Sequence, residues 1–158
     1  MNFLSTDPKI KIIQRFNVDM VAPGATAQFY FHITDNGLGL PIYMPIMVAR
    51  GSKPGPTLGF TAAVHGNELN GIKVIHKLMK EIEADIQNLS GAVVAVPVVN
   101  TVGALNTERV FDTGEDLNRI MPGKNKGNSS SQFAYRFVRT IVKPLDYLVD
   151  LHLSLIHI

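Results

Sequence analysis

Two short apolar runs on either side of an amphipathic segment restrict the folds open to this chain. The runs are Thr57–Val64 and Ala92–Val99, and both have the apolar character of strands that are buried on both faces of a sheet. The segment between them, Leu69–Ile86, places apolar residues at steps of three and four, which is the pattern of an amphipathic helix. The residues of this stripe are Ile72, Ile75, Leu78, Met79 and Ile82. Strand, helix and strand at this spacing predict a βαβ unit with parallel strands and a right-handed crossover.

The segments before this unit predict further strands. Ala27–Ile33 and Tyr43–Ala49 are rich in aromatic and β-forming residues, and the turn-forming letters DNGLGLP between them indicate a hairpin. Gly51–Pro56 has the composition of a second turn. We interpret Met1–Asn17 as an extended lead-in that could contain one short strand.

The second half of the chain combines a long irregular segment with one more helix and one more strand. Asn100–Ser131 is rich in Gly, Asn, Thr and Ser and shows little periodicity, so we predict a loop, and such long loops are usually functional. Gln132–Val142 has helical spacing and stops before Pro144. Leu145–Leu153 is predicted to be a third buried strand, and Pro97 to mark a bulge or the end of its strand. Together these elements predict an α/β fold with a mixed, mainly parallel sheet flanked by helices.

Composition excludes several classes of partner and site. The 158 residues suffice for one domain with a sizeable core. Fifteen Lys and Arg against thirteen Asp and Glu give a net charge of +2, and the basic residues are scattered, so we expect no nucleic-acid partner. The chain has no cysteine, so a transition-metal site would have to use His, Asp and Glu. No signal-peptide core and no apolar run of about 18 residues is present, which predicts a soluble, cytoplasmic protein without a membrane partner.

Polar residues follow the predicted strands at the positions where open α/β sheets carry their sites. His65 and Glu68 follow the first apolar run, and His152 ends the third strand. Two imidazoles and one carboxylate form the set that holds a catalytic zinc and leaves a fourth position for water. Two simpler interpretations stay open. Glu68 could be an acid in the first turn of a helix, and His152 could be a hydrogen-bonded histidine without a metal.

The loop sequence GEDLNR supplies further candidate site residues. Arg119 has a planar guanidinium that can bind a substrate carboxylate with two hydrogen bonds, and Asn118 adds a neutral donor. Arg109, ten residues before Arg119, is a second candidate cation. Alternatively, the motif is a solvated loop with an Asp-stabilised turn, or its charges form a surface ion pair.

Three blocks of the sequence resemble, in their residues and in their order, the motifs of the succinylglutamate desuccinylase/aspartoacylase family within the wider zinc carboxypeptidase-like group. They span Thr57 to His152 and read HGNELNG, VPVVNTVGALNTERVFDTGEDLNRIMPG and DLH. The resemblance implies a phosphorylase/hydrolase-like α/β core and one Zn²⁺ per chain. The zinc ligands that it implies are His65, Glu68 and His152. It also implies that Arg109 polarises the scissile carbonyl and that Asn118 and Arg119 hold the carboxylate of the substrate.

The activity implied by this resemblance is hydrolysis of an N-acyl amide bond, by metal-activated water, in a small carboxylate-bearing substrate. A zinc carboxypeptidase that acts on peptides or cell-wall fragments uses the same chemistry and remains an alternative. A metal-binding remnant without catalysis and an α/β domain without metal are alternatives from other classes. The sequence leaves open the acyl group, the amine, the oligomeric state and the metal bound in the cell.

The end of the chain departs from the family pattern. Family members continue beyond the DLH block and supply a catalytic glutamate as general base, whereas only six residues and no acid follow His152 here. These six, LSLIHI, also read as the translation of a transposon-adapter sequence, so we expect a truncated chain with a non-native tail at 153–158 and do not count His157 as a ligand. We expect N-terminal strands and a hairpin over 1–56, the front part of a catalytic core over 57–152, and zinc binding with impaired turnover.

Overall fold

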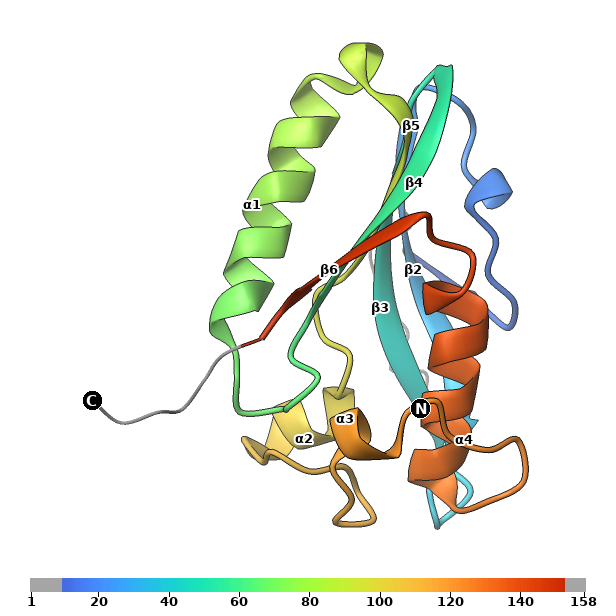
Figure 1. The fold of residues 1–158 in the computed structure, drawn as a ribbon, viewed down its shortest axis with the longest axis vertical. Helices are drawn as coiled ribbons and strands as arrows, with labels where there is room; N and C mark the ends of the chain where they lie inside the picture. Colours follow the sequence, from blue (N-terminus) through green and yellow to red (C-terminus); the bar gives the residue numbers. More distant parts are fainter. Residues whose placement is uncertain (1–9, 153–158) are drawn as a thin grey trace.

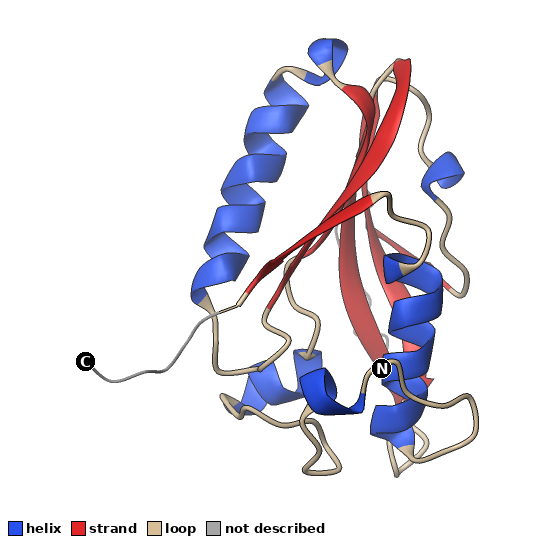
Figure 2. Cartoon of the chain, in the orientation of Figure 1, coloured by secondary structure: helices blue, strands red, loops and turns tan. Residues whose placement is uncertain are grey.

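The computed structural model describes residues 10–152, which form a six-stranded mixed sheet with helices on both faces (Figures 1 and 2). The strands are β1 (Ile10–Ile13), β2 (Ala25–Asp35), β3 (Pro41–Arg50), β4 (Lys53–Ala62), β5 (Ser90–Val96) and β6 (Tyr147–Leu151). Their order across the sheet is β1-β2-β3-β5-β4-β6. The pairs β1–β2, β4–β5 and β4–β6 are parallel, and β2–β3 and β3–β5 are antiparallel. The predicted mixed, mainly parallel sheet flanked by helices is therefore confirmed.

The helices divide between the two faces of the sheet. They are α1 (Asn70–Ala84), α2 (Thr101–Asn106), α3 (Leu117–Ile120) and α4 (Ser129–Phe137), with single turns at Val18–Met20 and Ile86–Asn88 and a π-helical turn at Val138–Val142. Figure 1 shows α1 and α4 on opposite sides of the sheet, and α2 and α3 together beside one end of it. Within residues 10–152, no helix combines the length and apolar composition needed to cross a membrane.

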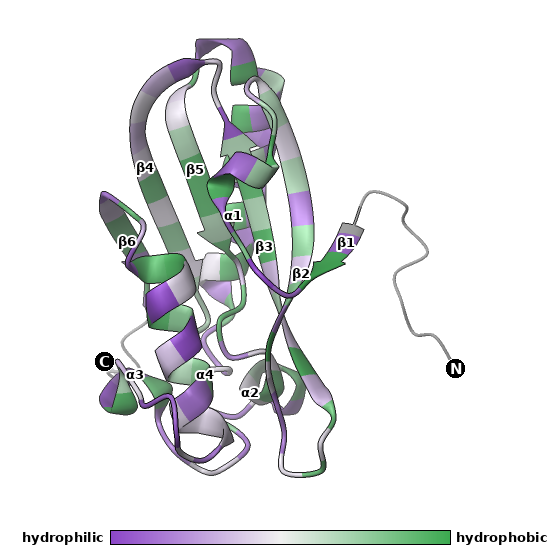
Figure 3. Cartoon of the chain, turned by 90° about the vertical axis from the view of Figure 1, so that its right-hand side faces the viewer, coloured by the Kyte–Doolittle hydropathy of each residue, from purple (hydrophilic) through white to green (hydrophobic). Residues whose placement is uncertain are grey.

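The alternation of side chains along β5 explains why both faces need a cover. Val93 and Ala95 pack with Ile75 and Met79 of α1, so this face forms one apolar cluster. Val94 and Val96 point the other way and belong to a larger cluster. This second cluster contains Phe133 and Phe137 of α4. Figure 3 shows the apolar colouring of β5 in the middle of the sheet against the mixed colouring of α4. A strand that is apolar on both faces must lie between two layers, as the sequence predicted.

The predicted βαβ unit is present as β4, α1 and β5. β4 and β5 are parallel neighbours, and the buried residues of α1 include Ile75 and Met79 from the predicted stripe. At its N-terminus α1 approaches the sheet closely. A Cβ added to Gly71 would lie 2.8 Å from Cβ of Ala62 at the end of β4. The predicted hairpin is also present, as the antiparallel pair β2–β3.

Two boundaries differ from the prediction. The predicted turn at Gly51–Pro56 is shorter, because β4 already begins at Lys53. The register between β4 and β5 shifts between Lys53 and Thr57, and such an irregularity accommodates Pro54 and Pro56 within a strand. β5 ends at Val96, directly before Pro97, so the proline marks a strand end.

The prediction of one long loop over Asn100–Ser131 was wrong in part. This segment contains α2 and α3 and the start of α4. Helices of four to six residues are too short to display an apolar period, so their signal lies in their caps. The side chains of Asn100, Asp116 and Asn128 each accept a hydrogen bond from a backbone N–H in the first turn of the helix that follows.

The prediction that Leu145–Leu153 forms a buried strand was also wrong in its burial. β6 is the outermost strand beside β4 among the described residues, and the side chains of Tyr147, Leu148 and Val149 are exposed. Residue 153 and the tail lie outside the described residues. An apolar outermost strand presents unpaired backbone groups to other chains and favours self-association.

We expect the exposed edge of β6 to make this chain self-associate. Tyr147→Lys places a charge on this edge and should lower light scattering at high protein concentration, because a charged edge resists strand pairing. Val74→Lys on α1 is the matched control, since Val74 is also an exposed apolar residue but its backbone lies within a helix. Equal effects of the two substitutions would mean that added charge alone, and not the strand edge, controls association.

Candidate metal centre

A sharp turn at the end of β4 delivers His65 to the edge of the sheet. Ala63, the first residue after β4, has a φ of 51°, in the left-handed region that non-glycine residues rarely adopt. Two backbone hydrogen bonds hold this turn, from Val99 N to Ala62 O at 3.0 Å and from Asn100 N to Ala63 O at 2.9 Å. The segment that follows β5 thus fixes the point at which β4 ends and the HGNE loop (His65–Glu68) follows.

Gly66 lets the HGNE loop press against α2. A Cβ added to Gly66 would lie 2.1 Å from the carbonyl carbon of Gly103 and 2.3 Å from N of Ala104. No side chain fits this distance, so the contact between the two backbones requires glycine. The close approach holds His65 and Glu68, on either side of the glycine, in fixed positions beside α2.

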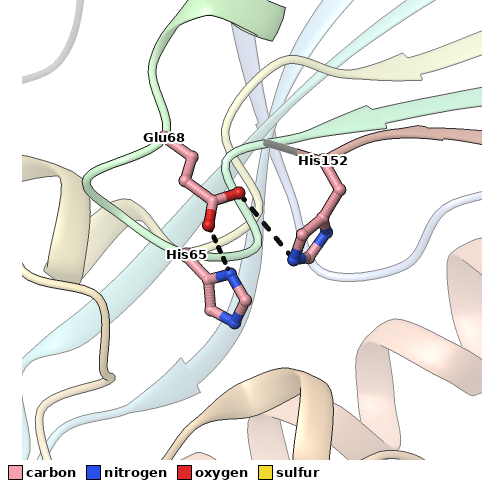
Figure 4. A group of neighbouring side chains, drawn as sticks. All are labelled: His65, Glu68 and His152. Atoms are coloured by element: carbon pink, nitrogen blue, oxygen red, sulfur yellow. Dashed lines mark hydrogen bonds and ion pairs between the residues drawn. The ribbon is translucent and has the colours of Figure 1, made fainter. Parts of the chain in front are cut away.

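The structure brings His65, Glu68 and His152 together, and one ligand atom from each lies within 4.8 Å of the others. Nδ1 of His65 is 2.9 Å from Oε1 of Glu68, and Nε2 of His152 is 3.8 Å from Oε2 of Glu68 (Figure 4). The two imidazole rings meet edge to face, with centroids 4.5 Å apart. His65 and Glu68 are 1% exposed and His152 is 31% exposed, so the group is buried on one side and open on the other.

Each histidine also contacts a second carboxylate on the side away from Glu68. Nε2 of His65 lies 3.1 Å from Oδ1 of Asp116, the N-cap of α3, and Nδ1 of His152 lies 2.8 Å from Oδ2 of Asp150 in β6. In metal sites, such outer carboxylates fix the orientation and the tautomer of a ligand histidine. The nitrogens that face Glu68 are therefore Nδ1 of His65 and Nε2 of His152.

Arg109 connects the buried carboxylate to the Asp116 loop. Its Nη1 lies 3.4 Å from Oε1 of Glu68, and its Nε and Nη2 each lie 3.2 Å from Oδ2 of Asp116. The side chain is 44% exposed, so the guanidinium borders both the buried group and solvent. The side-chain amide of Asn100 donates to the backbone carbonyl of Val110 at 3.1 Å, which holds the segment that carries Arg109.

Asn118 and Arg119 lie on the exposed surface of α3, beyond Asp116 as seen from the group of His65, Glu68 and His152. The backbone N–H of Asn118 donates to Oδ1 of Asp116 at 3.0 Å, and Nε of Arg119 lies 3.8 Å from Oδ2 of Asp116. The side chain of Arg119 is 84% exposed. Asp116 thus links both residues to His65.

The charge of Asp116 depends on competing influences. Burial is the largest of them and raises the pKa of this carboxyl. The hydrogen bond and charge of His65, followed by the charge and hydrogen bond of Arg109, together outweigh burial and lower the pKa below its ordinary value. Asp116 is therefore held ionised, as an acceptor for both side chains.

A second polar network fixes the loop before Asp116 to α4. Glu115 accepts hydrogen bonds from the hydroxyl of Ser130, from the side-chain amide of Asn128 at 2.6 Å and from the hydroxyl of Thr113 at 3.0 Å. These bonds, the one from Ser130 first, lower the pKa of Glu115 below its ordinary value of 4.5. The loop that presents Asp116 to His65 is thereby anchored at its neighbouring residue.

Sequence reasoning missed Asp116 and Asp150 as site residues. Both residues belong to motifs of the sequence, because Asp116 lies within GEDLNR and Asp150 begins DLH. An Asp that precedes a short polar run is equally typical of a helix cap or a turn, so only the structure shows that each carboxylate reaches a histidine.

Comparisons with known proteins give one consistent result. The sequence model of the succinylglutamate desuccinylase/aspartoacylase catalytic domain matches residues 54–157. A curated relative, the N-alpha-acetyl-L-2,4-diaminobutyric acid deacetylase of Halomonas elongata, is 32% identical over 112 residues, which cover 70% of this chain and 32% of that protein.

Solved structures agree with the sequence matches. The fold is similar to a succinylglutamate desuccinylase/aspartoacylase from Rhodobacter sphaeroides, with a TM-score of 0.75 and 26% identity over 87% of this chain and 42% of that one. It is also similar to the product-bound ectoine utilization protein EutE (DoeB) from Ruegeria pomeroyi, with a TM-score of 0.66 and 25% identity over 80% and 38% of the two chains. The chain thus spans about a third of the length of the curated relative and about two fifths of these structures.

We expect Glu115 to make part of the stability depend on pH. Because its pKa is lowered in the folded chain, its contribution is present above the ordinary value of 4.5 and is lost as the pH falls through the folded pKa. The unfolding free energy should therefore fall less between about pH 7 and pH 3 in Glu115→Gln than in the wild type. The difference should be less than about 1 kcal/mol, because the network borders solvent.

Urea unfolding at the two pH values measures this difference. Glu81→Gln on the exposed face of α1 is the control, because the side chain of Glu81 is 66% exposed and its contact with Lys77 is loose at 3.9 Å. A pH dependence that Glu115→Gln leaves unchanged would contradict the role assigned to this network.

Proposed function

The chain belongs to the succinylglutamate desuccinylase/aspartoacylase family, and from that premise we propose that it carries the metal-binding part of a zinc-dependent deacylase. The proposed reaction is hydrolysis of an N-acyl amide bond in a small molecule that bears a carboxylate. The family is named for removal of acyl groups, and the curated relative is named as a deacetylase of an amino acid, which supports this substrate class.

The group of His65, Glu68 and His152 is the observation that carries the proposal. Two imidazoles and one carboxylate are the donor set of a catalytic zinc site with one open position. The donors are close enough to converge on one ion with small adjustments, since zinc–ligand distances are about 2.0–2.2 Å. A bound zinc would lower the pKa of its water to about 7 and polarise a carbonyl oxygen.

Arg109 is assigned to the scissile carbonyl. Its guanidinium borders Glu68 and solvent, so it can donate to an oxygen that approaches the metal group from the open side. A fixed cation at this place stabilises negative charge as it develops on the carbonyl oxygen. Asp116 holds Nε and Nη2 of the same guanidinium and keeps it from swinging into solvent.

Asn118 and Arg119 are assigned to the carboxylate of the substrate. Arg119 is largely exposed and its contact with Asp116 is loose at 3.8 Å, which leaves donors for a bidentate bond to a carboxylate. Asp116 is the N-cap of α3, the short helix that carries Arg119, and it also contacts His65. The residue assigned to the substrate carboxylate is thus linked to a candidate zinc ligand.

We expect this chain to bind zinc but to turn over its substrate weakly. Hydrolysis needs a general base to take a proton from the attacking water. The carboxylates of Asp116 and Asp150 lie beside the group, but each is already occupied by a histidine. Metal binding is for this reason the first test, and hydrolysis the second.

We expect the purified chain to bind one zinc ion. His65→Ala should lower the affinity at least about 100-fold, because the loss of one ligand in three removes several kcal/mol of binding free energy. His76→Ala, an exposed histidine of α1 outside the group, should bind zinc like the wild type. Isothermal titration calorimetry with a competing chelator measures these affinities. A wild-type chain without zinc affinity, or an unaffected His65→Ala variant, would refute the proposed site.

We expect the zinc-loaded chain to prefer ligands with a free carboxylate. N-alpha-acetyl-L-2,4-diaminobutyrate and other N-acetyl amino acids should bind more tightly than their carboxamides. Arg119→Ala should lower the ratio of these two affinities roughly 10- to 100-fold, as expected for the loss of a charge-assisted bond. Lys124→Ala removes a nearby exposed cation and is the control.

Ligand-detected NMR measures binding, and release of acetate measures residual turnover. Tighter binding or faster cleavage of peptides than of N-acetyl amino acids would instead favour the carboxypeptidase alternative. A full-length relative assayed in parallel shows whether weak turnover belongs to this chain alone.

A further inference from the structure

Asp150 joins strand β4 to the candidate ligand His152. Oδ1 of Asp150 accepts a hydrogen bond from the hydroxyl of Thr61 at 2.7 Å, and Oδ2 lies 2.8 Å from Nδ1 of His152. Thr61 and Asp150 are direct partners in the parallel β4–β6 ladder. Asp150 and His152 are two residues apart, which in an extended chain places both side chains on the same side.

We propose that Asp150 and Thr61 are positioning residues for His152, and that together they hold its ring with Nε2 directed at Glu68 and the metal. This inference rests on the zinc site of the proposed function and adds two residues to it. Asp150 contacts His152 and Thr61 contacts Asp150, so both residues act on the candidate site through the imidazole of His152.

The chemistry of the three groups gives the direction of each hydrogen bond. A carboxylate oxygen accepts, so the 2.8 Å contact forms a hydrogen bond when Nδ1 of His152 carries a proton and donates it to Oδ2 of Asp150. A neutral imidazole with its proton on Nδ1 keeps its lone pair on Nε2. This nitrogen lies 3.8 Å from Oε2 of Glu68, on the side where a metal would bind. Asp150 therefore selects both the ring orientation and the tautomer that a metal ligand needs.

Thr61 fixes the carboxylate in turn. Its side chain is buried within β4, and a β-branched residue in a strand has few side-chain rotamers. The hydroxyl therefore provides a rigid donor for Oδ1, which leaves Oδ2 for the histidine. This support matters because His152 follows the last residue of an exposed strand, where the backbone alone restrains the ring weakly.

The test measures two properties of the 158-residue chain, zinc affinity and the tautomer of His152 in the metal-free state. We expect Asp150→Ala to weaken zinc binding about 10- to 100-fold, the usual effect of removing an outer partner of a ligand histidine. In ¹⁵N–¹H NMR spectra of the metal-free chain, the same variant should change His152 from the Nδ1–H form to a mixture of tautomers. Loss of packing alone would not select one ring nitrogen.

Further variants separate positioning from general stability. Thr61→Val should weaken zinc binding roughly 3- to 10-fold through loss of one hydrogen bond, whereas Thr61→Ser keeps the hydroxyl and should restore wild-type affinity. Asp146→Ala is the matched control. Asp146 also joins the β6 segment to β4, through a 2.7 Å hydrogen bond from the backbone of Thr57, but it lies before the start of β6 whereas His152 lies after its end.

The outcomes distinguish this inference from the function on which it rests. If the wild-type chain binds no zinc, the proposed function fails and the inference fails with it. If the wild type binds zinc but Asp150→Ala binds equally well with an unchanged tautomer, only the inference is overturned. Equal losses in Asp146→Ala and Asp150→Ala would likewise overturn it, because they would trace the effect to strand pairing. Should Asp150→Ala fail to fold, the comparison of Thr61→Val with Thr61→Ser decides.

Discussion

The burial of one carboxylate governs the arrangement of the candidate metal centre. Glu68 is 1% exposed, and an ionised carboxylate at such a place is strongly destabilising unless positive or hydrogen-bonding groups surround it. His65, His152 and Arg109 approach it from three segments of the chain that are far apart in sequence. These groups stabilise the buried carboxylate, and a divalent cation bound between Glu68 and the two histidines would offset its charge more directly.

The order of strands explains how these segments meet. β4 and β6 are parallel neighbours, so the residues that follow them emerge at the same edge of the sheet, and His65 and His152 both lie there. The chain that leaves β5 at this edge returns through α2 and supplies Arg109. Glycine is required at Gly66 because this returning segment packs directly against the HGNE loop. The site therefore depends on the parallel core of the sheet and on one close backbone contact.

The two candidate histidine ligands are supported in different ways. Asp116 is a helix cap that also binds Arg109, so the orientation of His65 is coupled to the residue assigned to the carbonyl. Asp150 is a strand residue held by Thr61, so the orientation of His152 depends on the pairing of β6 with β4. The known relatives that match this chain are longer, and the chain spans 32% of the curated relative and 42% of the Rhodobacter sphaeroides structure.

The sequence by itself determined the elements whose signals are local. Apolar runs and a helical period specified the β4–α1–β5 unit, and the motif letters pointed to His65, Glu68 and His152 as one group. Tertiary structure decided what depends on contacts between distant segments. The exposed position of β6 follows from strand order, which an apolar run cannot encode, and α2 and α3 are too short for a period. The pairing of Asp116 and Asp150 with the two histidines was likewise decided by tertiary structure, because the local sequence around an Asp does not specify which side chain it will contact.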